Sequence, residues 1–159
     1  MISCFSSVYG QKNLKNEKGY PYVDESLFPY VKEYLFDMID KGISVDNFFK
    51  LDSVLLVDTS TQICLSDHAE GCCSVVEKKV KIRTPSPKSD GDSNLNTFLK
   101  LAVYHELGHC VLRLTHNPYT FSIMNAGHRK LDRYEILWDR LREEYISYYF
   151  FCEKVKSYK

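Results

Sequence analysis

Long apolar runs are absent from this 159-residue sequence. No hydrophobic stretch approaches the ~18 residues that a membrane-spanning helix needs, so no such helix is predicted. An excess of charge is absent as well, because 21 lysines and arginines balance 21 aspartates and glutamates. Nucleic acids attract proteins through a surplus of positive charge, so this balance argues against nucleic acid as the main partner.

Paired CxxC motifs are also missing, although the chain has six cysteines. A structural zinc ribbon needs such pairs, so this class of site is not expected. Two interpretations of the cysteines stay open. They are buried free thiols or, in an exported protein, Cys64 forms a bridge to Cys72 or Cys73.

The N-terminus, MISCFSSVYG, lacks the basic and apolar regions of a complete signal peptide. Its Ile-Ser-Cys stretch nevertheless resembles the junction at which a bacterial lipoprotein leader is cut. We therefore treat residues 1–20 as an extension, with Cys4 as the candidate site of lipidation and membrane anchoring. This interpretation places the protein in the bacterial cell envelope or outside the cell, and a cytoplasmic location stays open.

The length predicts one domain, which we assign to residues 21–159. Apolar positions three and four apart predict helices in three segments: 24–41, about 94–97 to 114, and about 130–156. β-Branched segments predict strands at 53–60, 63–66 and 73–83. A loop is predicted between the last strand and the second helix. The stripe on the last helix is mostly aromatic, which favours packing within the molecule, and we expect a monomer.

The segment HELGHCVLRLTH begins at His105, in an otherwise apolar helix. His105 and His109 are four residues apart, so a helix places both imidazoles on one face, where they can hold one Zn²⁺ at ~2.0–2.1 Å. Glu106 lies about 100° around the helix from His105 and borders that face without being a ligand. The arrangement is typical of a general base that acts on water beside a metal ion. Cys110 points away from the metal and is expected in the core.

Two helix histidines leave one protein ligand to find, and the chain must turn back to supply it. His116 lies just past the predicted end of the helix and is the main candidate. Other carboxylates and histidines are rivals for this position. They are Glu135, Glu143, Glu144, His68 and His128.

This histidine-rich segment, followed by SIMN at 122–125, resembles the metzincin metallopeptidases, whose pattern is H-E-x-x-H-x-x-G-x-x-H with a methionine turn. The resemblance implies one zinc ion per chain with three ligands: His105, His109 and His116. It also implies Glu106 as the catalytic base and Met124 as the methionine that packs under the ligands. His128 and Tyr119 are further candidates for the cleft.

The spacing before His116 is one residue longer than in this pattern, and Arg113 stands where a glycine is expected. The helix must then reverse through a non-glycine left-handed residue or a longer bend. Residues 70–150 resemble more closely a group of small exported or lipid-anchored bacterial proteins that share HELGHC and SIMN.

The expected fold is α+β and zincin-like: a small mixed sheet packs on the active-site helix, with an N-terminal and a long C-terminal helix around it. Residues 73–83 are expected to form the rim of the cleft. The predicted function is a zinc-dependent peptidase, an endopeptidase rather than an exopeptidase, that acts on peptides or proteins. The alternative is a catalytically silent zinc-stabilised binding or scaffold protein with the same fold.

Overall fold

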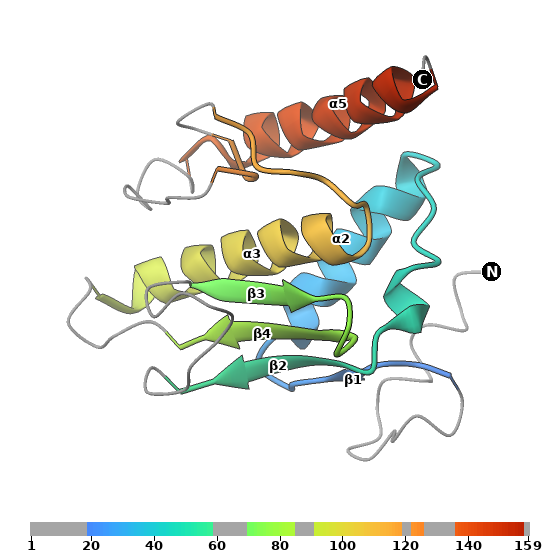
Figure 1. Ribbon diagram of the computed structural model, residues 1–159. Helices are drawn as coiled ribbons and strands as arrows, with labels where there is room; N and C mark the ends of the chain where they lie inside the picture. The colour runs from blue at the N-terminus through green and yellow to red at the C-terminus, as the bar shows by residue number, and fades with distance from the viewer. Residues whose placement is uncertain (1–18, 59–69, 85–90, 119–121, 126–135, 158–159) are drawn as a thin grey trace.

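The computed structural model describes residues 19–58, 70–84, 91–118, 122–125 and 136–157. Several expectations from the sequence lie outside these residues. They are the strand at 63–66 and the candidate residues Cys4, His68, Tyr119, His128 and Glu135. The described part is an α+β structure in which helices cover one face of a four-stranded sheet (Figure 1).

The sheet has the strand order β1-β2-β4-β3. Its strands are β1 (Tyr22–Val23), β2 (Ser53–Val57), β3 (Gly71–Ser74) and β4 (Lys79–Arg83). Strands β1, β2 and β4 are parallel, whereas β3 is antiparallel to β4 and forms an edge of the sheet. The sheet is therefore mixed, as predicted. The two-residue strand β1 was not predicted.

The single strand expected at 73–83 is wrong, because these residues form most of a hairpin of β3 and β4. Ser74 begins the turn, and its Oγ accepts a hydrogen bond from the backbone N–H of Glu77 over 3.1 Å. Lys78 completes the turn in a left-handed conformation with φ of 54°. Val76 is 95% exposed at the tip of this hairpin. Buried and partly buried residues alternate within β4, where Val80 and Ile82 are buried.

Three α-helices are described: α2 (Phe28–Asp40), α3 (Gly91–Cys110) and α5 (Trp138–Lys156). A short 3₁₀ helix, η1 (Phe48–Lys50), precedes β2. Gly42 follows α2 in a left-handed conformation with φ of 70°, which is typical of a glycine that ends a helix. None of the described helices has the length and apolar character needed to cross a membrane.

Three boundaries of the helices α3 and α5 differ from the prediction. Helix α3 begins at Gly91 within the expected loop and ends at Cys110, four residues before the expected end. Helix α5 begins at Trp138, because Leu137 leaves the helical conformation with φ of −103° and ψ of 10°. Apolar residues continue beyond the end of α3 and before the start of α5, so periodicity alone could not reveal where the backbone leaves the helix.

Three buried tyrosines join the helices above the sheet. Tyr34 of α2, Tyr104 of α3 and Tyr145 of α5 meet edge to face, with ring centroids 5.2–6.5 Å apart. The Tyr104 hydroxyl donates to Asp37 over 2.5 Å, and Arg142 of α5 reaches the same carboxylate over 3.3 Å. Helix α3 therefore lies between the sheet and α5 and is held on both sides (Figure 1).

Candidate metal centre

Three histidine side chains converge beside the C-terminal half of α3. His105 and His109 belong to α3, and His116 lies on the segment that follows it. One ring nitrogen of each residue lies within 4.8 Å of the other two. His105 is buried, His109 is partly buried and His116 is exposed, so the cluster reaches the surface. Among the described residues, no second group of this kind occurs.

The chain reverses directly after α3, and this reversal brings His116 to the cluster. Arg113 adopts a left-handed conformation with φ of 59°, which is uncommon for a residue with a side chain. The backbone N–H of Leu114 donates to the carbonyl of Gly108 over 3.0 Å. The sequence required a left-handed residue or a longer bend at this point, and Arg113 is that residue.

Backbone carbonyls hold both helix histidines in one tautomer. The Nδ1 atom of His105 lies 2.7 Å from the carbonyl oxygen of Ile123. The Nδ1 atom of His109 lies 2.7 Å from the carbonyl oxygen of Leu114. A carbonyl oxygen only accepts hydrogen bonds, so each Nδ1 bears the hydrogen and each neutral ring presents a lone pair on Nε2.

The two Nε2 atoms fit a metal ion. They lie 3.1 Å apart, so two lone pairs face each other unless a proton or a cation lies between them. Two nitrogens that bind one tetrahedral zinc ion at ~2.0–2.1 Å are separated by roughly 3.3 Å. Burial lowers the pKa of His109, which favours the neutral imidazole that binds metals. The donor set therefore suits zinc.

Met124 is fully buried and packs against α3 at Gly108. A Cβ atom on Gly108 would lie 2.7 Å from the Sδ atom of Met124 and 2.7 Å from the hydroxyl of Tyr145, so glycine provides the necessary room. The Met124 carbonyl accepts a hydrogen bond from the N–H of Asn117 over 2.8 Å. The turn that contains Met124 thus supports the segment that bears His116.

Glu106 is buried on the side of α3 that faces β3. A Cβ atom on Gly71 would lie 2.6 Å from both Cγ and Oε1 of Glu106, so the carboxylate packs directly against the strand. Burial raises the pKa of Glu106 to about 8. A hydrogen bond from the backbone N–H of Cys73 opposes this rise, and the charge of Glu70 adds to it.

The register of the hairpin explains why the N–H of Cys73 is available. The N–H of Arg83 donates to the carbonyl of Glu70 over 2.9 Å, which marks these two residues as a hydrogen-bonded pair. Hydrogen-bonded and non-bonded pairs alternate along an antiparallel ladder. The backbone groups of Gly71 and Cys73 therefore point away from β4, toward the edge that the described strands leave open. Glu106 accepts from Cys73 at that edge.

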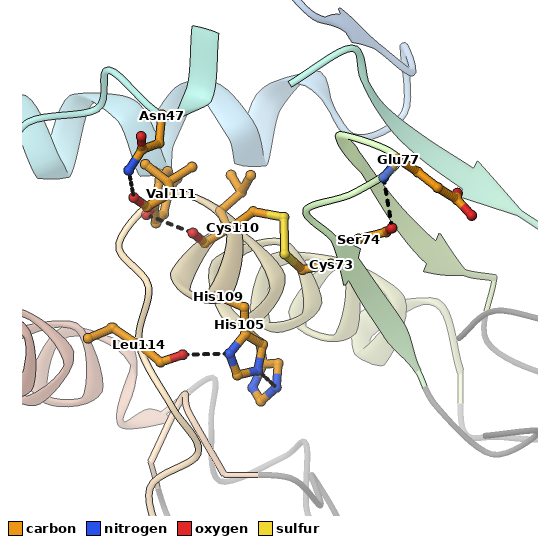
Figure 2. The surroundings of a disulfide bond; sticks show 11 residues. Asn47, Cys73, Ser74, Glu77, His105, His109, Cys110, Val111 and Leu114 are labelled. Carbon is orange, nitrogen blue, oxygen red and sulfur yellow. Dashed lines mark hydrogen bonds between the residues drawn. A yellow bond between two sulfur atoms is a disulfide. The ribbon is translucent and has the colours of Figure 1, made fainter. Parts of the chain in front are cut away.

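A disulfide bond joins Cys73 to Cys110, with the two Cα atoms 5.6 Å apart (Figure 2). Cys110 is buried and points away from the histidines, as predicted, but its expected role as a plain core residue was incomplete. The bond excludes a Cys64–Cys73 bridge, and the free-thiol interpretation is wrong for these two cysteines. Cys72 is disulfide-bonded as well, whereas Cys152 is free.

The rival carboxylate ligands in the described residues are engaged elsewhere. Glu143 lies 3.3 Å from Lys41, and Glu144 lies 3.1 Å from Arg140. Both are exposed charges on α5, and neither belongs to the histidine cluster. The described residues therefore leave His116 as the third candidate ligand.

The sequence predicted the histidines and Glu106 as site residues. It did not predict that Gly71 and Cys73 would surround the Glu106 carboxylate. One signal was present: Cys110 follows Glu106 by four residues and therefore lies on the same face of α3. The bonding partner of Cys110 depends on which strand becomes the edge beside α3, and no local pattern contains that information.

No family model matches this chain, and no curated protein or solved structure shows significant similarity to it.

Proposed function

We propose that the protein is a zinc-dependent peptidase with a zincin-like fold. The observation that supports this function is the convergence of three imidazoles with a buried carboxylate beside them. His105, His109 and His116 would hold the ion, and their neutral nitrogens suit it. When bound, zinc would polarise a substrate carbonyl and make water more acidic.

Glu106 supplies the proton transfer in this proposal. The desolvated carboxylate accepts a proton from the attacking water and passes it to the leaving amine. Its neighbours on β3 restrict it to one position, because Gly71 packs against it and the Cys73 N–H donates to it. Zinc binding alone does not require this carboxylate, which favours an enzyme over a zinc-stabilised scaffold.

The open edge of β3 is the proposed binding site for the peptide. Gly71 directs its N–H and C=O away from β4, and an extended substrate can pair with them as an additional strand. Such pairing uses backbone groups in the middle of a chain, which favours an endopeptidase. This edge replaces the broader rim predicted at 73–83.

We also propose that the protein is a monomer that acts in the bacterial cell envelope or outside the cell. The disulfide between Cys73 and Cys110 supports this location, because such bonds persist mainly in oxidising compartments. Membrane anchoring through a lipidated Cys4 stays part of the proposal and is tested by mass analysis of the protein from its native membrane fraction.

Metal analysis combined with peptide cleavage tests the function. The wild-type protein should contain about one zinc per chain and cleave members of a mixed peptide library at internal bonds. Glu106→Gln should retain zinc and lose roughly 10²–10⁴-fold in turnover, which is the usual contribution of a general base. Zinc without cleavage in the wild type would favour the scaffold alternative, and equal turnover in both proteins would exclude this role of Glu106.

A further inference from the structure

Glu106 and Cys110 occupy the same face of α3, one helical turn apart, and both meet β3. Cys110 is bonded to Cys73, and the backbone N–H of that same Cys73 donates to the Glu106 carboxylate. Figure 2 shows the disulfide at the end of α3, with His105 and His109 on another side of the helix. One strand residue is thus covalently tied to the helix and hydrogen-bonded to the catalytic candidate.

Few backbone hydrogen bonds among the described residues fix the position of strand β3, although Cys72 of the same strand is also disulfide-bonded. The strand has four residues and, within the part of the chain that the structure describes, pairs with β4 along one side only. The register leaves two hydrogen-bonded pairs within the strand, Cys72 with Lys81 and Ser74 with Lys79. A short edge strand with so few bonds is mobile unless another contact holds it. The Cys73–Cys110 bond is such a contact.

The histidines are held by other parts of the chain. The carbonyl of Ile123 orients His105, and the carbonyl of Leu114 orients His109. Neither carbonyl belongs to β3. Loss of the disulfide should therefore move the strand and the carboxylate environment while the three imidazoles keep their places.

We infer that the Cys73–Cys110 disulfide is a positioning element for the general base: it holds the Cys73 N–H and Gly71 against Glu106 and is needed for turnover but not for metal binding. The inference rests on the proposed peptidase function. The role of Cys73 and Cys110 is positional, because neither sulfur takes part in the reaction.

The test compares Cys73→Ala/Cys110→Ala with wild type and with Val76→Ala, a control at the exposed tip of the same hairpin. The double variant leaves no new free thiol. We expect one zinc per chain in all three proteins, and a Co²⁺ absorption spectrum that is the same after metal exchange. Turnover (kcat) of the double variant should fall roughly 10–100-fold, the scale of a small displacement of a catalytic group, with KM within about twofold.

A second variant and a second measurement keep the inference testable if the double variant unfolds. Gly71→Ala places a methyl group 2.6 Å from Glu106 and should lower kcat while zinc stays bound. Amide hydrogen exchange needs no activity: residue 73 should be protected in wild type and exchange at least tenfold faster in the disulfide-free protein. The exchange rate at residue 73 tests the role of the disulfide independently of activity. The peptidase proposal has a separate test, because it fails if the zinc-loaded wild type cleaves no peptide.

Unchanged kcat in both Cys73→Ala/Cys110→Ala and Gly71→Ala would overturn the inference. Unchanged exchange at residue 73 would overturn it as well. Zinc loss that parallels the loss of activity would assign the disulfide to the metal ligands rather than to Glu106 and would also contradict it.

Discussion

His116 is the residue on which the proposed three-histidine metal site depends most, because it is the exposed member and lies outside α3. Loss of a residue that only supports a metal ligand typically weakens metal binding roughly 10–100-fold. His116→Ala would remove a ligand itself and should therefore weaken zinc binding by more than this. Competition with a chelator of known affinity measures this change. His128→Ala is the matched control and should bind zinc as wild type does. If His128→Ala weakened zinc binding and His116→Ala did not, His128 would be the ligand.

Gly108 shows how a residue without a side chain shapes the site. It lies between Glu106 and His109 in chain order, and only its missing Cβ lets Met124 and Tyr145 approach α3. Gly108→Ala should therefore lower the free energy of unfolding by about 1–3 kcal/mol through overpacking, although alanine favours helices in general. Urea denaturation of the metal-free protein gives the value. A stabilised variant would show that the contact with Met124 is looser than described.

At the scale of secondary-structure elements, the three helices depend on hydrogen bonds of different kinds. The Tyr104 hydroxyl donates to a carboxylate, Asp37, whereas the Tyr145 hydroxyl donates to a neutral carbonyl, that of Tyr104, over 3.2 Å. Hydrogen bonds to charged groups contribute about 1.5–3 kcal/mol and neutral ones about 0.5–1.5 kcal/mol.

Tyr104→Phe should consequently destabilise the protein more than Tyr145→Phe, although both rings are buried and keep their packing. Denaturant unfolding of the two variants under identical conditions measures the difference. Equal losses would show that the charge of Asp37 adds nothing to this contact and that Arg142 already satisfies the carboxylate.

The elements also show how far the sequence determines this structure. Apolar spacing and β-branched residues predicted α2, β2 and α3, and the spacing of His105, His109 and His116 predicted a cluster that the fold brings together. The hairpin of β3 and β4 was not predicted, because its turn is formed by residues such as Ser74 and a left-handed Lys78 and contains no glycine or proline. The short edge strand and its disulfide depend on tertiary contacts, which no local sequence pattern predicts.

At the scale of the whole molecule, a bound metal ion would add a connection between α3 and the segment that follows it, which the hydrogen bonds from Leu114 to Gly108 and from Asn117 to Met124 already hold in place. The candidate ligands come from α3 and from the chain that returns after Arg113, so a bound ion would bridge the helix and this segment. An ion that binds only the folded protein stabilises it in proportion to the logarithm of its concentration over Kd.

Chelation should therefore lower the melting temperature, and stoichiometric Zn²⁺ should restore it. The gain in free energy should approach ~4 kcal/mol when free zinc is ~1,000-fold above Kd. Calorimetry with and without chelator checks this, and Mg²⁺ serves as the control because imidazole ligands do not suit it. An unfolding temperature that is independent of zinc would contradict a site in the folded state.

The most direct test of the account is a crystal structure of zinc-loaded protein with anomalous diffraction data collected on both sides of the zinc absorption edge. The account predicts one peak per chain, ~2.0–2.1 Å from a ring nitrogen of each of His105, His109 and His116, with Glu106 nearby but not bound. A map with no peak among the three rings, or with zinc held by other residues, would contradict it.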